Sequence, residues 1–136
     1  MIKFLPTIDA PANTKLPLRS TQFSAGYDFY APTDIFVPAG GESVLIPLNI
    51  KAIMPGDMVL MLFIRSSLAV KFNLSLVNSV GIIDSDYANN QDNDGNIGIK
   101  FRNNGSETII IREGERCAQG ILLHLPMQLP HTTQRL

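Results

Sequence analysis

The sequence predicts an all-β protein with a sandwich, jelly-roll or barrel architecture. Short apolar segments alternate with turn signals along most of the chain, which is the usual pattern of these folds. Only Ser66–Phe72 resembles a helix. Seven of the nine prolines lie at or before Pro55 and two at or after Pro126, so the middle of the chain is free to form central strands. The 136 residues are typical of one domain, and we expect residues 1–136 to form a single unit.

The expected strands follow in chain order. Residues 44–51 alternate with a period of two, and Pro47 marks that strand as an edge strand or a bulge. Met58–Ile64 is apolar on both faces, so we expect both faces to be covered, either in a parallel sheet or at a subunit interface. Further short strands are expected at residues 74–77, 80–83, 97–101, 108–111 and 121–125.

Two segments depart from the strand pattern. Ser66–Phe72 predicts a helix of about two turns, with Ser66 or Ser67 as its N-cap. Residues 89–96 contain no apolar side chain and predict an exposed, mobile loop. Its alternating oxygen-bearing residues resemble a calcium loop superficially, but Gly95 is misplaced and no glutamate closes the loop at the required spacing.

Composition excludes several classes of protein. The 11 Lys and Arg nearly balance the 12 Asp and Glu, so the chain lacks the basic footprint of a duplex-binding protein. The longest apolar run, Met58–Ile64, is far shorter than the roughly 20 residues of a membrane span, and no secretory signal is recognisable. The lone Cys117 excludes an internal disulfide and suggests a reducing compartment. We therefore expect a soluble cytoplasmic protein that binds neither nucleic acid nor membrane.

Residues 80–87 contain the first candidate for chemistry. Asp84 and Asp86 end an apolar strand beside Tyr87. If Asp84 points inward, an apolar wall would raise its pKa and make it a better base. Alternatively, both aspartates cap a turn, and the segment by itself favours this interpretation.

The other candidates are weak when taken singly. Arg65 and two serines precede the short helix and could bind phosphate, or they could be an N-cap beside an exposed arginine. Cys117 could be reactive if it is exposed, but a small packed residue is the favoured interpretation. His124 and His131 have no partners at metal-binding spacing, so we interpret both as structural or surface residues.

Taken together and in order, these segments resemble the trimeric dUTPase family. Residues 25–29 (AGYDF) match the first of its five motifs, residues 65–67 (RSS) the second, residues 81–87 (GIIDSDY) the third and residues 114–119 (GERCAQ) the fourth. Each motif alone is weak, but four in the right order, spread over nearly the whole chain, are a specific match.

The resemblance implies a distorted, jelly-roll-like β-barrel with one short helix after Arg65, assembled as a homotrimer whose active sites are shared between subunits. It implies hydrolysis of dUTP to dUMP and pyrophosphate, with Mg²⁺ bound to the three phosphates. Asp84 would be the base that activates water, and Asp28 would contact the metal through water. The implied substrate-binding residues are Arg65, Ser66, Ser67 and Gln119 for the phosphates, Tyr87 for deoxyribose, and Asn78 with the hairpin backbone, including Gly81 and Ile83, for uracil.

This chain departs from the family pattern at three places. Ile64 stands where the second motif usually begins with proline. Residues 89–94 intervene before Gly95, where the third motif usually continues directly to glycine. The fifth motif, a glycine-rich closing tail with an arginine and an aromatic ring, is apparently absent, and Arg135 is a candidate for its arginine that we do not assign.

Other functions remain open at this stage. A dCTP deaminase has the same fold, but it needs a glutamate where this chain has Lys100. A nucleotide-binding regulator could keep the site and contact a protein partner through residues 89–96. A purely structural jelly roll would account for the strands but not for the ordered motifs.

Overall fold

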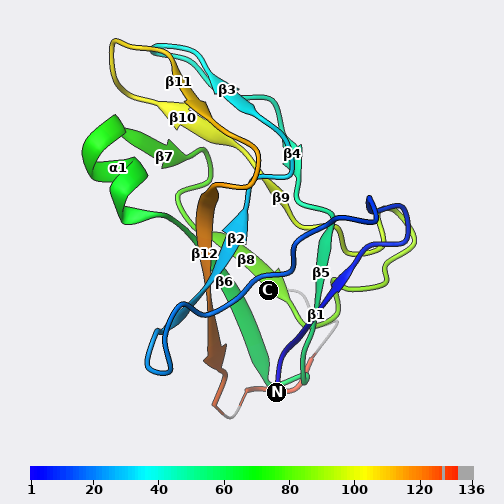
Figure 1. Cartoon of the computed structure of the whole chain (residues 1–136). Helices are drawn as coiled ribbons and strands as arrows, with labels where there is room; N and C mark the ends of the chain where they lie inside the picture. Colours follow the sequence, from blue (N-terminus) through cyan, green and yellow to red (C-terminus); the bar gives the residue numbers. More distant parts are fainter. Residues whose placement is uncertain (127, 132–136) are drawn as a thin grey trace.

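A four-stranded antiparallel sheet runs through the centre of the protein (Figure 1). The computed structural model describes residues 1–126 and 128–131. The strand order in this sheet is β2-β12-β6-β8. The bounds of its strands are Gly26–Tyr30 for β2, Arg116–His124 for β12, Met58–Ile64 for β6 and Gly81–Asp84 for β8. The predicted strand at Met58–Ile64 is therefore confirmed, and it is central.

Four two-stranded antiparallel sheets surround the central sheet (Figure 1). They pair β1 (Lys3–Pro6) with β5 (Ile50–Ile53), β4 (Ile46–Pro47) with β9 (Gly98–Ile99), β10 (Phe101–Asn103) with β7 (Leu74–Leu76), and β11 (Ile109–Ile111) with β3 (Ile35–Val37). This arrangement confirms the all-β prediction. The parallel sheet considered for β6 is wrong, because β6 pairs antiparallel with both of its neighbours.

The core lies between these sheets. Phe4 packs edge to face against Tyr27 and Phe29, with ring centroids 5.1 and 5.5 Å apart. Cys117 is completely buried, and burial raises the pKa of its thiol to about 12, so the packed interpretation is confirmed. His124, in contrast, is exposed and lies 2.8 Å from an Asp57 carboxylate oxygen. The surface role expected for that histidine is therefore confirmed.

The expected strand at residues 44–51 is divided in two. Asn49 has a left-handed φ of 64° and separates β4 from β5. The alternation of buried residues survives this break at Ile46, Leu48 and Ile50, but Val44 is 74% exposed and does not belong to the strand. Pro47 pairs with Gly98 in a two-stranded sheet, which confirms the edge position.

The helix α1 has the predicted bounds, Ser66–Phe72, but not the predicted cap. Its N-cap is Arg65, which has extended backbone angles and makes no side-chain capping bond. Both serines therefore lie inside the first turn, where their hydroxyls are not used to cap the helix. The helix ends at Asn73, which is left-handed and donates its N–H to the Ala69 carbonyl. Within the described part of the chain, no helix is long and apolar enough to cross a membrane.

We predict that Gly120→Ala destabilises the fold. A Cβ at this position would lie 2.8 Å from Phe29 Cε2 and 3.0 Å from Leu60 Cδ1, and both of these side chains are buried. Overpacking of this kind costs about 1–3 kcal/mol, which urea unfolding would measure. Gly56→Ala is the control, because a Cβ there meets nothing within 4 Å. Equal stability of the two variants would contradict the prediction.

Candidate active site

The structure brings one group of the predicted site residues together at the junction of β2, β12 and β6. Gln119 on β12 is the register partner of Asp28 on β2 and of Phe63 on β6. Arg65 follows directly after the end of β6. A Cβ at Gly26 would lie only 3.0 Å from Gln119 Oε1, so the missing side chain at this position makes room for the Gln119 amide. The first, second and fourth motifs therefore meet at one place.

A cavity of about 590 Å³ opens beside this junction, and its charged lining is mostly basic. Four cationic side chains contribute to it, those of Lys15, Arg19, Arg65 and Arg116, against the carboxylates of Asp28 and Glu115. Arg116 Nη1 lies 3.7 Å from Asp28 Oδ2, and the Asp28 side chain is only 18% exposed. This excess of positive charge suits a polyanionic ligand. We call this cavity the basic cavity.

Ser67, in the first turn of α1, has an unused hydrogen-bonding group. Its Oγ is the only buried side-chain nitrogen or oxygen without a hydrogen-bond partner among the described residues. Leaving such a group unpaired typically costs about 1–3 kcal/mol. Ser67 is two residues from Arg65 in the sequence, but only Arg65 of the two lines the basic cavity.

The second group of predicted residues lies along β8, at the edge of the sheet. Asp84 is the last residue of β8, and a turn closed by the Tyr87 N–H and the Asp84 carbonyl follows, with an N–O distance of 3.1 Å. The side chains of Asp84 and Asp86 are exposed. The alternative of a carboxylate buried against an apolar wall is therefore wrong for the single subunit, and the favoured interpretation, in which both aspartates lie at a turn, agrees with the structure.

An apolar cavity of about 540 Å³ lies beside β8. Its lining residues are Leu45, Pro47, Ile82, Ile83 and Gly98, together with the polar Tyr87, Asn93 and Asn96. Ile82 is 56% exposed, although it belongs to a strand. A largely apolar hollow with a few polar groups is typical of small-molecule sites. We call this cavity the apolar cavity.

Two other residues of the predicted uracil site do not line the apolar cavity. Asn78 is exposed in the turn that precedes β8. Gly81 pairs with Leu62, and a Cβ at Gly81 would lie 3.1 Å from Leu62 Cβ, so glycine permits the close approach of β8 and β6. Asn78 and Gly81 therefore adjoin the edge of β8 rather than the hollow.

The two groups of residues lie far apart within one chain. Asp84 is aligned with Val59 near the start of β6, whereas Arg65 follows Ile64 at its other end. Six residue steps separate Val59 from Arg65, or about 20 Å at a strand rise of 3.3 Å per residue. A base acts at about 3 Å from its proton, so a reacting centre beside Asp84 lies well away from the backbone of Arg65 in the same chain.

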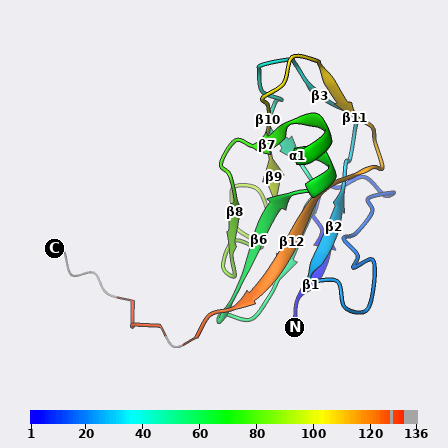
Figure 2. The ribbon, with the colours of Figure 1, turned by 90° about the vertical axis from the view of Figure 1, so that its left-hand side faces the viewer.

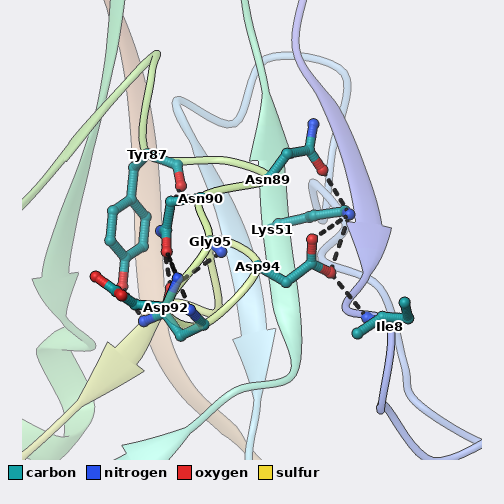
Figure 3. Close-up of polar contacts among 9 residues, drawn as sticks. Ile8, Lys51, Tyr87, Asn89, Asn90, Asp92, Asp94 and Gly95 are labelled. Carbon is teal, nitrogen blue, oxygen red and sulfur yellow. Dashed lines mark hydrogen bonds and ion pairs between the residues drawn. The ribbon is translucent and has the colours of Figure 1, made fainter.

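Residues 89–96 form the exposed loop that the sequence predicts. Hydrogen bonds attach this loop to Lys51 and to Ile8 (Figure 3). Lys51 Nζ lies 2.7 Å from Asn89 Oδ1 and 3.0 Å from both carboxylate oxygens of Asp94. The Ile8 N–H donates to Asp94 Oδ2 over 2.8 Å. Within the described residues, no group of three or more His, Cys, Asp or Glu side chains could hold a metal ion.

Sequence reasoning missed several of these residues. Lys15 and Arg19 line the basic cavity, and Lys51 anchors the loop, but none of the three lies in a motif or near its partners in the sequence. No local signal could have identified them. Arg135, considered for a fifth motif, lies outside the described residues.

Comparison with known proteins gives a consistent result. A family model described as dUTPase matches residues 12–136. The chain is 45% identical over 113 residues to the deoxyuridine 5'-triphosphate nucleotidohydrolase of Lactococcus lactis, covering 82% of this chain and 74% of that protein. It is 38% identical over 111 residues to the enzyme of the same name from Desulfitobacterium hafniense, covering 80% and 70%.

Solved structures agree with this result. A dUTPase from Streptococcus mutans superposes with a TM-score of 0.84 at 38% identity, covering 93% of this chain and 98% of that one. A dUTPase from phage phi11 of S. aureus, described with a structural Mg(II) ion, superposes with a TM-score of 0.78 over 99% and 96% of the two chains. At 20% identity, this second likeness shows the fold alone.

We predict that the Lys51–Asp94 ion pair makes the free energy of unfolding depend on pH in the acidic range. The hydrogen bond from Lys51, assisted by that from the Ile8 N–H, holds the pKa of Asp94 below its ordinary value. A carboxyl group with a lowered pKa stabilises the fold above its unfolded pKa of about 4, and this contribution is lost as pH falls through the folded value. Urea unfolding should therefore show a steeper loss of stability below about pH 4 in the wild type than in Asp94→Asn. Parallel pH profiles would contradict this prediction.

Proposed function

The chain belongs to the dUTPase family, and we propose that it hydrolyses dUTP to dUMP and pyrophosphate. One observation carries the proposal beyond the family match. The same chain presents a basic cavity at one end of β6 and an apolar cavity with an accessible carboxylate near the other. These two surfaces have the chemistry needed for the triphosphate and for the nucleoside of a single substrate.

In this mechanism Asp84 is the general base. Its exposed carboxylate takes a proton from a water molecule, and the oxygen of that water attacks the α-phosphorus. A new P–O bond forms to this oxygen, the bond between the α-phosphorus and the bridging oxygen of pyrophosphate breaks, and pyrophosphate leaves with the bonding electrons. A positioned base of this kind typically contributes about 10²–10⁴-fold to the rate.

The basic cavity holds the phosphates. Arg65 can engage phosphate oxygens through two parallel hydrogen bonds, and the Ser66 and Ser67 hydroxyls add donors beside it. Binding through Ser67 would require its Oγ to become accessible, because this atom is buried in the single subunit. Gln119 supplies an amide N–H at the same junction of strands. Together these groups would neutralise and orient the leaving pyrophosphate.

The edge of β8 and the apolar cavity receive the nucleoside. Among the described residues, β8 pairs with β6 alone, so its other edge keeps unpaired backbone groups. Such groups, near Gly81 and Ile83, can read the edge of uracil together with the Asn78 side chain. The ring of Tyr87 lines the cavity and would pack against deoxyribose, leaving no room for a 2′-hydroxyl group.

We further propose a homotrimer in which each site combines the β8 surface of one subunit with the basic cavity of another. The separation of about 20 Å along β6 between Asp84 and Arg65 supports this arrangement, since the backbone of one chain holds these two groups far apart. Two further features favour contact between subunits. Four residues of the apolar strand β6 stay partly exposed in the single chain. Residues 128–131 run away from the body of the chain as an exposed arm (Figure 2).

The donor groups fit Mg²⁺ held chiefly by substrate. The described residues provide no metal-binding cluster, but Asp28 supplies one half-buried carboxylate at the basic cavity. Asp28 would therefore touch the ion through its water shell, while phosphate oxygens bind it directly. When bound, the ion would neutralise charge that develops on the phosphates.

The deaminase alternative lacks a proton-shuttling carboxylate. Lys100 lies between β9 and β10, and its Nζ is 3.3 Å from a Glu42 carboxylate oxygen. Glu42 also pairs with Arg102, at 2.6 Å. The carboxylate that pairs with Lys100 is therefore already engaged by two cations, and it belongs to a different segment.

We predict that Asp84→Asn abolishes pyrophosphate release and keeps nucleotide binding. The amide cannot take a proton from water, but it preserves the shape of the turn. A pyrophosphate-release assay with dUTP and Mg²⁺ should show a loss of at least about 10²-fold, while calorimetry with dUTP still shows binding. Full turnover in this variant would show that Asp84 is not the base.

We also predict that two inactive variants complement each other in mixed trimers. Asp84→Asn lacks the base and Arg65→Ala lacks a phosphate donor, but a shared site can take one intact group from each subunit. Random co-assembly should restore up to about a quarter of wild-type turnover.

The control mixture combines Asp84→Asn with the double variant Asp84→Asn/Arg65→Ala and should stay inactive, because no subunit supplies the base. No recovery in the first mixture despite mixed assembly, or sedimentation of the active wild type at 14.9 kDa, would reject the shared site.

A further inference from the structure

We infer that residues 89–94, acting through Asn93, position the Tyr87 ring and thereby set the preference for deoxyribonucleotides over ribonucleotides. This inference rests on the proposed function, in which Tyr87 packs against the sugar. Asn93 is a positioning residue in this account, because it acts on the substrate only through Tyr87. Three layers of contacts in this part of the chain support this role.

The first layer closes the base of the segment. The Asn89 N–H donates to the Asp94 carbonyl over 3.2 Å. Gly95 has a left-handed φ of 79°, and a Cβ there would lie 2.5 Å from Ala88 Cα and 2.9 Å from the Tyr87 carbonyl oxygen. The chain therefore leaves after Ala88 and returns directly beside it. Residues 89–94 therefore protrude as a closed segment that begins and ends beside Ala88.

The second layer anchors this base to the rest of the fold (Figure 3). Lys51 on β5 reaches both ends of the segment, at Asn89 and at Asp94. The side chains of Lys51 and Asp94 are only 14% and 24% exposed, so solvent screens this pair less than a typical surface pair. The Ile8 N–H, just beyond β1, also donates to Asp94. The segment is thus fixed to β5 and to the end of β1.

The third layer orients the Asn93 side chain. Asn93 Oδ1 accepts hydrogen bonds from Asn90 Nδ2 over 2.8 Å and from the Gly95 N–H over 3.0 Å. Asn90 Oδ1 in turn accepts from the Asn93 N–H over 3.0 Å, and Asn90 Nδ2 also donates to the Tyr87 carbonyl over 2.8 Å. With Oδ1 occupied in this way, the Nδ2 group of Asn93 is directed to the phenol of Tyr87.

The phenol of Tyr87 is consequently held by two hydrogen bonds. Asn93 Nδ2 donates to Tyr87 Oη over 2.7 Å, and Tyr87 Oη donates to the Asn96 carbonyl over 3.0 Å. These two bonds use the phenol once as acceptor and once as donor, as its chemistry allows. The turn from Asp84 fixes the backbone end of the same residue. The ring is therefore restrained at both ends.

A ring restrained in this way can discriminate between sugars. Tyr87, Asn93 and Asn96 are the polar members of the lining of the apolar cavity, so their hydrogen bonds define one wall of the proposed sugar site. A free ring could move aside to admit a 2′-hydroxyl group at little cost, whereas a restrained ring must break a hydrogen bond to do so. Preorganisation of this kind converts local hydrogen bonds into specificity.

The test measures kcat/KM for dUTP and for UTP and compares their ratio between variants. Asn93→Ala removes the donor to Tyr87, and Tyr87→Phe keeps the ring but removes both phenol bonds. Each change should lower the dUTP/UTP ratio by about 3- to 10-fold, the usual net worth of one hydrogen bond. Gln91→Ala is the matched control, because this exposed side chain belongs to the same segment and makes no side-chain hydrogen bond in the described structure. Its ratio should not change.

A double variant separates positioning from a general loss of structure. If Asn93 acts through the phenol, Asn93→Ala should change the ratio less than about 2-fold when Tyr87→Phe is already present. Thermal unfolding of each variant identifies changes that merely destabilise the fold. Should Asn93→Ala fail to fold, Tyr87→Phe alone decides, since it leaves every other bond of Asn93 in place.

The possible outcomes distinguish this inference from the proposed function. An unchanged dUTP/UTP ratio in folded Asn93→Ala or in Tyr87→Phe, or additive effects in the double variant, would overturn the positioning role while the wild type still hydrolyses dUTP. A wild-type protein that does not hydrolyse dUTP would instead overturn the proposed function.

Discussion

The antiparallel pairing of β12 with β6 is the constraint on which the candidate site depends. The register runs without interruption from Ala118 opposite Ile64 to His124 opposite Met58. It places Gln119 at the end of β6 from which Arg65 emerges, while β8, paired on the other side, ends level with Val59. Because a one-residue slip would turn every side chain of β12 to the opposite face, the packing of the core and the position of the phosphate donors are specified together.

The protein accommodates an insertion next to the proposed sugar site by satisfying the polar groups of that insertion locally. Residues 89–94 contain no apolar side chain that could anchor them in the core. Asparagine side chains instead take up backbone N–H groups within the segment, and Lys51 joins its two ends. The chain returns at Gly95 directly beside Ala88, so the inserted segment adjoins Tyr87. The insertion that interrupts the third motif can thus help to hold Tyr87, a residue of that motif, in place.

The charges of this chain are distributed unevenly over its surface. Charged residues make up only 17% of the chain, yet four cations gather around one cavity. An excess of positive charge at one surface suits the anion that the proposed function places there. In the proposed shared site, a neighbouring subunit would bring phosphate to the exposed Asp84.

The sequence by itself determined the strand Met58–Ile64, the helix Ser66–Phe72, the exposed loop and the identity of the motif residues. These features depend on local periodicity, turn residues and residue chemistry, which a linear pattern contains. Only the tertiary structure decided that Asn49 divides a predicted strand, that both serines lie inside the helix rather than at its cap, and that Lys51 reaches Asp94 across 43 positions of sequence. It also decided that the two groups of predicted site residues lie near opposite ends of β6. Register and long-range pairing depend on how the whole core packs, and no local segment contains that information.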